Sequence, residues 1–137
     1  MIKTVDDSVL ASLAEEARQK PRKRTNFNIH ADLNDPIQRL CITGDPETVF
    51  PVHRHLEKWE LITRVCGSFT IYTYHEDGTV SGQYEFAPGK LSIAELPEGI
   101  WHNCIFHEPG TTFIEVKKGP YAPLTPEEQA PFEGVKH

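Results

Sequence analysis

The chain has 137 residues, which is enough for one domain with a single core but leaves little room for a second. Its net charge of −6 argues against a duplex nucleic acid as partner. No apolar run reaches the roughly 18 residues of a membrane span, and acidic residues follow the N-terminus where a signal peptide would be basic. We therefore expect a cytoplasmic protein with no membrane association.

Residues 6–19 predict an amphipathic helix. Asp6 or Asp7 can cap its N-terminus, and Pro21 ends it. Apolar residues recur at helical spacing at Val9, Leu10, Leu13, Ala14 and Ala17. The following stretch, 18–24, carries five positive charges in seven residues. We interpret it as a solvated linker, or alternatively as a local site for a phosphate or carboxylate.

From about residue 37 the pattern changes to short runs of β-branched and aromatic residues, separated by Gly, Pro and Asp. The predicted strands are 38–43, 58–66, 68–75, 81–86, 91–95, 101–107 and 111–116. Strands at this spacing predict an all-β fold, a small antiparallel β-barrel or jelly roll with one N-terminal α-helix. We divide the chain into a helix and basic linker (1–24), a barrel (25–118) and a Pro-rich C-terminal extension (119–137).

The three cysteines, Cys41, Cys66 and Cys104, lie far apart and form no Cys-x-x-Cys pair. This pattern argues against a disulfide framework and against a zinc knuckle. We expect buried, reduced thiols that act as small hydrophobic side chains.

His53 and His55 lie two residues apart, and a short predicted bend separates them from an acidic residue, Glu60. On an extended strand such residues face the same side, about 6 to 7 Å apart, so their imidazoles can converge on one ion. Glu60 follows five residues later and can supply a carboxylate, although Glu57 is a competing choice.

A second patch places His102 directly after a turn, at the start of a predicted strand. In a closed barrel this strand can lie beside the first patch and bring a third imidazole to the same point. Three nitrogens and one oxygen suit one divalent transition metal, such as Fe, Mn, Zn or Ni, and suit Mg or Ca poorly.

The spacing of these two patches resembles the two sequence motifs of the cupin superfamily. The run from His53 to Gly67 resembles the first motif, and the run from Pro97 to His102 resembles the core of the second. The resemblance implies a metal held inside a β-barrel. Carried over onto this chain, the implied ligands are His53, His55, Glu60 and His102.

A narrower resemblance extends over nearly the whole chain. The segments 24–30, 35–39, 53–60, 118–121 and 130–132 together resemble the WbuC-type cupin metalloproteins. That family is associated with bacterial O-antigen and surface polysaccharide gene clusters, so the resemblance implies a link to polysaccharide biosynthesis. It implies no particular reaction.

Several polar residues are candidates for binding a substrate. Asn26, Asn28 and His30 alternate and can share one face, either as a polar wall for sugar hydroxyls or as a hydrogen-bonded strand or turn. Arg39 and Arg54 can bind a carboxylate or phosphate through bidentate contacts, or can lie exposed. As acid–base candidates we name Glu57 and, after a Gly-Pro pair, Tyr121.

These observations predict a metal-dependent enzyme that acts on a carbohydrate, an anionic sugar derivative or a sugar nucleotide, as an isomerase or epimerase by Lewis-acid chemistry. A non-haem iron dioxygenase is one alternative. A metal-dependent sugar-binding or sensing module without turnover is another, because one fold serves both roles. A structural barrel without metal is a third. We also expect a homodimer, since a partner can cover an exposed sheet edge.

Overall fold

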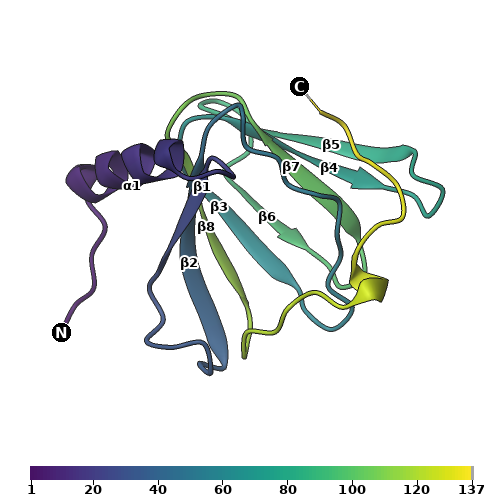
Figure 1. The fold of residues 1–137 in the computed structure, drawn as a ribbon, viewed down its shortest axis with the longest axis horizontal. Coiled ribbons are helices and arrows are strands. Elements are labelled where there is room, and N and C mark those ends of the chain that lie inside the picture. Colours follow the sequence, from purple (N-terminus) through teal and green to yellow (C-terminus); the bar gives the residue numbers. More distant parts are fainter. Residues whose placement is uncertain (137) are drawn as a thin grey trace.

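The structure is a computed structural model that describes residues 1–136, and it has two antiparallel sheets that face each other (Figure 1). Its elements are α1 (Asp7–Gln19), β1 (Arg24–Asn28), β2 (Ile37–Gly44), β3 (Glu60–Cys66), β4 (Phe69–Tyr74), β5 (Val80–Phe86), β6 (Ile93–Leu96), β7 (Trp101–Phe106), β8 (Thr111–Lys118) and the short 3-10 helix η1 (Pro126–Glu128). The larger sheet has the order β1-β2-β8-β3-β6 and the smaller one β5-β4-β7. This architecture confirms the predicted small β-barrel or jelly roll with one N-terminal helix.

Helix α1 lies against the outside of the larger sheet, next to β1 and β2 (Figure 1). The side chain of Asp6 accepts a hydrogen bond from the backbone N–H of Val9 at 2.9 Å, which caps the helix as predicted. Leu13 and Ala17 are buried against the sheet. Neither α1 nor η1, the helices of the described chain, is long and apolar enough to cross a membrane.

The strands bury a phenylalanine-rich core between the sheets. Phe69, Phe86 and Phe106 have no exposed surface, and Phe113 is 5% exposed. The rings of Phe69 and Phe86 stack with centroids 4.4 Å apart. These residues lie near one end of the barrel, and the same strands continue from there to the opposite end, where the polar residues lie.

The smaller sheet is extended by two irregular segments. His53 forms an antiparallel bridge with His102 of β7 on one side and with Gln129 of the C-terminal tail on the other. The tail, yellow in Figure 1, then runs along this sheet. Phe132 and Val135 of the tail pack on a second apolar cluster of Val52, Tyr74 and Trp101. The tail therefore supports the segment that carries His53.

The main difference from the sequence-based expectation is β1, which is not among the seven predicted strands, although a hydrogen-bonded strand or turn was one interpretation of Asn26, Asn28 and His30. It pairs with β2 at the edge of the larger sheet, with Arg24 opposite Gly44 and Asn28 opposite Leu40. Its polar residues fit an edge position, where one side of the strand meets solvent. All three cysteines are free, and Cys41 and Cys104 are buried.

Candidate metal centre

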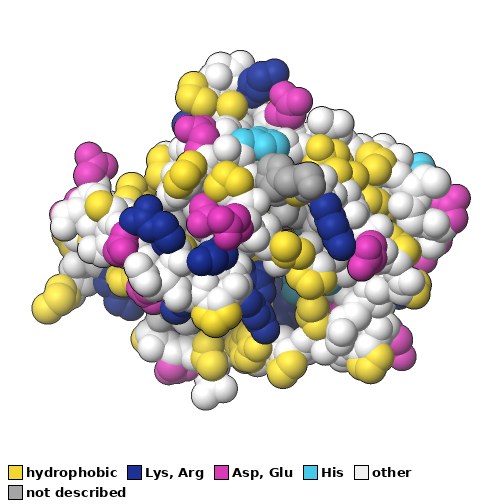
Figure 2. Space-filling model, turned by 45° about the horizontal axis from the view of Figure 1, so that its top comes forward, with side chains coloured by type: hydrophobic (Ala, Val, Ile, Leu, Met, Phe, Trp, Pro, Cys, Tyr) yellow, Lys and Arg dark blue, Asp and Glu magenta, His cyan; other side chains and the backbone are white. Residues whose placement is uncertain are grey.

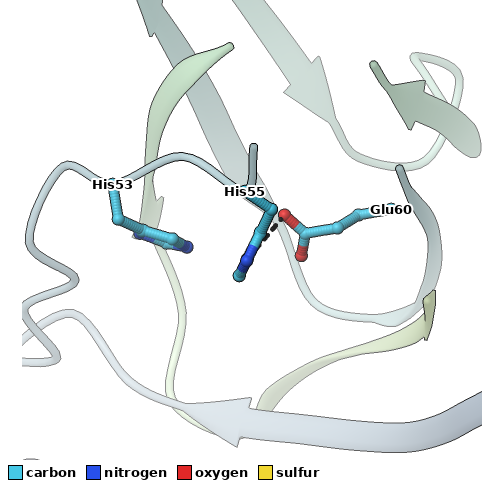
Figure 3. Close-up of side chains that lie close together, drawn as sticks. All are labelled: His53, His55 and Glu60. Atoms are coloured by element: carbon cyan, nitrogen blue, oxygen red, sulfur yellow. Dashed lines mark ion pairs between the residues drawn. The ribbon is translucent and has the colours of Figure 1, made fainter. Parts of the chain in front are cut away.

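Three of the predicted metal ligands form a compact group in the barrel. One potential ligand atom each from His53, His55 and Glu60 lies within 4.8 Å of the others. Figure 3 shows that the two imidazoles and the carboxylate point toward one another. The histidines come from the segment between β2 and β3, and Glu60 is the first residue of β3. The bend between them brings the carboxylate to the imidazoles.

His102, the fourth predicted ligand, lies beside this group. Its Nε2 is 3.2 Å from Oε1 of Glu60, the same oxygen that lies 3.2 Å from Nε2 of His55. Its ring centroid is 4.4 Å from that of His53. Paired backbone hydrogen bonds of 2.9 and 3.0 Å between these two histidines fix the position of His102. The larger sheet thus supplies the carboxylate, and the smaller sheet with its added segment supplies imidazoles.

Two of the imidazoles are oriented for metal binding by backbone carbonyls. Nδ1 of His53 lies 3.0 Å from the carbonyl oxygen of Pro51, and Nδ1 of His102 lies 3.0 Å from that of Ile100. A carbonyl only accepts hydrogen bonds, so each Nδ1 carries a proton and Nε2 is the ring nitrogen that is directed at the centre and available to a metal. A metal-ligating histidine is held in the same way. The donor set therefore fits a divalent transition metal.

The protonation states also favour a cation at this position. Burial and repulsion from His102 lower the pKa of His53 to about 3, so its ring is neutral at neutral pH. Burial acts to raise the pKa of Glu60, but hydrogen bonds with Glu115, His102 and His55 outweigh it and hold this pKa well below its usual range. Glu60 is therefore an anion, and a metal needs neutral imidazoles and an ionised carboxylate.

Two further inward-facing residues, Glu115 and Lys117, adjoin Glu60 and were missed by the sequence analysis. Glu115 is 5% exposed, and burial together with the neighbouring Glu60 raises its pKa well above the usual range. A hydrogen bond between two carboxyl groups requires a proton on one of them, and the opposite directions of the two pKa shifts favour Glu115 as the donor to Glu60. Nζ of Lys117 lies 3.1 Å from Oε1 of Glu115. The only sequence signal was their alternation with the buried Phe113 along one strand.

An open cleft of about 870 Å³ reaches His53. The tail and the segment 46–53 supply most of its walls, including Phe50, Tyr121 and Phe132. These walls are largely apolar, with a few polar groups such as Gln129, as in many small-molecule sites. On the face shown in Figure 2, basic and acidic side chains are interspersed, so no single charge dominates that surface.

Of the three alternating candidate residues, Asn26 and Asn28 lie in β1, whereas His30 lies beyond its end. Asn26 and Asn28 both lie on the side of β1 that carries Ile42 and Leu40 in the register, but both are exposed at this sheet edge, and their side chains are hydrogen-bonded to each other at 3.0 Å. His30 is 4% exposed, and its Nδ1 lies 3.0 Å from the backbone N–H of Arg39. Its Nε2 is buried without a hydrogen-bond partner among the described residues. The register thus supports the shared face for the two asparagines.

The two candidate arginines are engaged elsewhere. Arg39 alternates with the inward residues of β2 and pairs with Asp35 at 3.0 Å. The guanidinium of Arg54 lies 4.1 Å from the ring centroid of Trp101, and its Nε donates to the carbonyl of Glu127 at 2.9 Å. The structure therefore brings neither arginine to the histidine group.

The acid–base candidates also differ in position. Tyr121 lines the cleft together with His53 and is 51% exposed. Glu57 is exposed in the bend between the histidines and β3, and Glu60 occupies the place beside the imidazoles. The geometry thus favours Glu60 over Glu57 as the carboxylate ligand.

Solved structures with this fold support the architecture but differ in sequence. KdgF from Halomonas sp. is 15% identical, with a TM-score of 0.59, over 76% of this chain and 85% of that one. A sugar phosphate isomerase of the cupin superfamily from Silicibacter pomeroyi is 14% identical, with a TM-score of 0.55, over 71% and 60%. An oxalate decarboxylase from Bacillus subtilis is 15% identical, with a TM-score of 0.60, over 76% and 28%. At these identities the similarity establishes the cupin fold alone.

The sequence itself matches one family model. No curated protein matches the chain. The model described as Domain of unknown function (DUF6016) matches residues 5–86, which is more than half of the chain. The protein therefore belongs to the DUF6016 family and has the cupin fold.

Proposed function

We propose that this protein is a metal-dependent cupin that acts on a carbohydrate or sugar nucleotide, in the context of bacterial surface polysaccharide biosynthesis. The observation that carries the metal-dependent part is the convergence of His53, His55 and Glu60, with His102 beside them. A bound divalent ion would act as a Lewis acid that polarises a substrate carbonyl or hydroxyl. The residues of the chain hold and orient the reacting groups.

The polar residues of the barrel have distinct roles in this proposal. His53, His55, His102 and Glu60 are the ligands, while Glu115 holds the Glu60 carboxylate through a hydrogen bond. Tyr121, on the wall of the cleft, is the candidate to donate or accept a proton at the substrate. The tail limits the access of water to the centre along one side, because it lies beside the His53 segment.

Support for a sugar ligand comes from two comparisons. The resemblance of several segments to WbuC-type cupins links the chain to polysaccharide gene clusters. Among the structures with the same fold is one named as a sugar phosphate isomerase. Asn26 and Asn28, which are exposed at the edge strand β1 on the side of Ile42 and Leu40, offer amide groups that suit sugar hydroxyls.

The first test is elemental analysis of protein purified without a histidine tag and without added metal. We expect about one transition-metal ion per chain in the wild type and none in the His53→Ala/His55→Ala double variant. His75→Ala is the matched control, because His75 is exposed beyond the end of β4. If the wild type contains no metal and takes up none on titration, the metal-dependent function is wrong.

A second measurement separates the enzyme from its alternatives. Metal-loaded protein is incubated with a panel of nucleotide sugars, and products are followed by proton NMR while oxygen consumption is recorded. Isomerised product without oxygen uptake supports the Lewis-acid enzyme, and product with oxygen uptake identifies a dioxygenase instead. Saturable binding without product, whichever metal is loaded, identifies a sugar-binding or sensing module. The His102→Ala variant should lose any turnover.

A further inference from the structure

Lys117 is a largely buried cation beside the candidate metal ligands. In the pairing of β3 with β8 it lies directly opposite Glu60, and in the pairing of β2 with β8 it lies opposite Gln38. Directly opposed residues of antiparallel strands face the same side, so all three point into the barrel. The side chain of Lys117 is 18% exposed, so it remains accessible from the mouth of the barrel.

Other basic residues gather around Lys117. Burial, together with repulsion from Lys117 and Lys118, lowers the pKa of Lys58, and attraction to Glu128 and Glu60 opposes this shift. Nζ of Lys58 is fixed by a 3.0 Å hydrogen bond to the carbonyl of Pro120. Tyr121, which lines the cleft, also interacts electrostatically with Lys117. Tyr121 therefore connects this basic group to the cleft that reaches His53, although the lysines themselves do not line that cleft.

The charges of the centre do not balance once a divalent ion is bound. The three imidazoles are uncharged ligands and Glu60 supplies one negative charge, while Lys117 and Lys58 add positive charge. Glu115 lies 3.1 Å from Nζ of Lys117, but it is also hydrogen-bonded to Glu60, and two hydrogen-bonded carboxyl groups hold one proton and therefore carry one negative charge between them. A largely desolvated excess of positive charge is unfavourable unless an anion compensates it. Charge-assisted hydrogen bonds from amines to carboxylate or phosphate oxygens are the strongest that such a site can make.

We propose, building on the proposed metal-dependent function, that the natural ligand is an anionic sugar derivative whose carboxylate or phosphate binds Lys117. Its hydroxyl or carbonyl oxygens then lie at the metal, and Lys58 adds a longer-range attraction. The shared chemistry is that of a sugar acid or a sugar phosphate. A neutral sugar lacks the group that Lys117 recognises.

The test compares three probes that share one ring and differ in charge: glucose, glucuronate and glucose 6-phosphate. Each is titrated calorimetrically into zinc-loaded and into metal-free protein. We expect at least one of the two anions to bind the zinc-loaded protein at least tenfold more tightly than glucose. In Lys117→Met that preference should fall at least tenfold with zinc content unchanged. Lys58→Met should show a smaller loss and serves as the second variant if Lys117→Met does not fold.

Lys90→Met is the control, because Lys90 is exposed and pairs with Glu85 on β5, remote from the ligands in the sheet order. It should leave the preference unchanged. Equal affinity for glucose and both anions overturns the proposal, as does binding of none of the three or an unchanged preference in both lysine variants. Carboxylate and phosphate ligands are distinguished by which anion binds more tightly. If the protein takes up no zinc, the metal-dependent function is wrong. The binding of anions by Lys117 is then still tested by comparing glucose with the two anions on metal-free protein.

A second inference comes from the outer face of the larger sheet, of which α1 covers only the part near β1 and β2. The strand register places one row of outward residues across four neighbouring strands. Its members, in the order β2, β8, β3 and β6, are Arg39, Val116, Leu61 and Glu95. The next row includes Ile114, Thr63 and Ile93, and Ile93 is 58% exposed. The middle of these two rows is apolar apart from Thr63, the neighbouring row places the exposed Lys118 on β8, and the two sides carry Glu95 and Arg39, which pairs with Asp35.

The row from Arg39 to Glu95 can pair with the same row of a second copy, because its two ends carry opposite charges and its middle is apolar. A twofold axis parallel to the strands, between β8 and β3, would place Arg39 of one copy opposite Glu95 of the other and Val116 opposite Leu61. Stacked sheets lie about 10 Å apart, which apolar side chains fill and charged side chains can bridge. We infer that this face binds a second copy of the chain to form a symmetric dimer.

The test is the molar mass of the protein in solution, measured by light scattering after size-exclusion chromatography. The wild type should be a dimer, and Ile93→Lys should be a monomer. The single changes Arg39→Glu and Glu95→Arg should each weaken the dimer at least tenfold, and the double exchange should restore it. Gln83→Glu on the exposed part of β5 should have no effect. A monomeric wild type, or a dimer that none of these changes on the larger sheet weakens, would refute the inference.

Discussion

The two ends of the barrel are built from the same strands but have opposite character. At one end β7 and β8 direct Phe106 and Phe113 inward, and at the other they direct His102 and Glu115 inward. Both ends are buried, since Glu60 is 4% exposed and Phe113 is 5% exposed. β7 and β8 thus each run from one end of the barrel toward the other, and their inward side chains change from apolar to polar along the way.

This comparison shows how a small barrel can separate stability from function. The apolar end gains stability by removing hydrophobic surface from water. The polar end is more costly to bury, and its groups are satisfied by one another, by backbone carbonyls and, in our proposal, by a metal. Changes at one end should therefore affect folding, and changes at the other should affect binding.

The largest expected effect is at the apolar end. Phe106→Ala removes a ring with no exposed surface that contacts Phe50 edge-on, with centroids 5.4 Å apart. We expect a loss of about 3–5 kcal/mol in the free energy of unfolding, measured by urea denaturation. Tyr84→Ala, at a position 44% exposed, should cost less than about 1 kcal/mol. Comparable losses in the two variants would contradict the assignment of this end as the stabilising core.

At the polar end, metal binding should add stability that depends on the ligands. Zinc at a hundred times its dissociation constant should raise the free energy of unfolding of the wild type by about 2.7 kcal/mol. His102→Ala should lose most of this increment, because it removes one imidazole from the group. The His75→Ala control should keep it. Thermal unfolding with and without zinc measures the increment, and an equal increment in His102→Ala would exclude His102 as a ligand.

The hydrogen bond from Glu115 should have a smaller effect, again confined to the polar end. Glu115→Ala leaves the Glu60 carboxylate without this bond, and zinc affinity should fall by about 10- to 100-fold. Glu115→Gln should retain most of the affinity, because its amide can still donate to Glu60. Competition with a zinc chelator gives the affinities, with the exposed Glu85→Ala as the reference. Equal losses in the Gln and Ala variants would show that the charge or volume of Glu115 matters instead.

Much of the fold was predictable because its signals are local. The cap at Asp6, the apolar residues of α1 and the turn-bounded β-branched runs each act over a few residues. The convergence of three histidines and one carboxylate was predictable for a related reason: the spacing from His53 to Glu60 is short, and a turn precedes His102. The structure brings these four side chains together, while their binding of a metal stays a prediction.

The remainder depended on which strand lies beside which. Arg39 and Lys117 are both basic residues in strands, yet one faces outward and the other faces the ligands. A single residue of register reverses this assignment, and the sequence of one strand does not fix its partner's register. Strand β1 was missed because its polar residues lack the apolar alternation of a strand with one buried face. Its pairing with β2 gives it the strand conformation.

The smallest expected effect is a pH dependence of the metal-free protein that originates at the polar end. The pKa of His53 is about 3 in the folded protein and about 6.5 for a free histidine, so between these values the unfolded chain binds one more proton. The contribution of His53 to the free energy of unfolding is therefore fully present above pH 6.5. It is lost as the pH falls, by up to about 1.4 kcal/mol per pH unit. Urea denaturation at pH 7, 6 and 5 measures the slope, which should be shallower by this amount in His53→Gln. An identical slope in wild type and variant would mean that folding does not lower the pKa of His53. The description of the polar end as buried would then not hold for this residue.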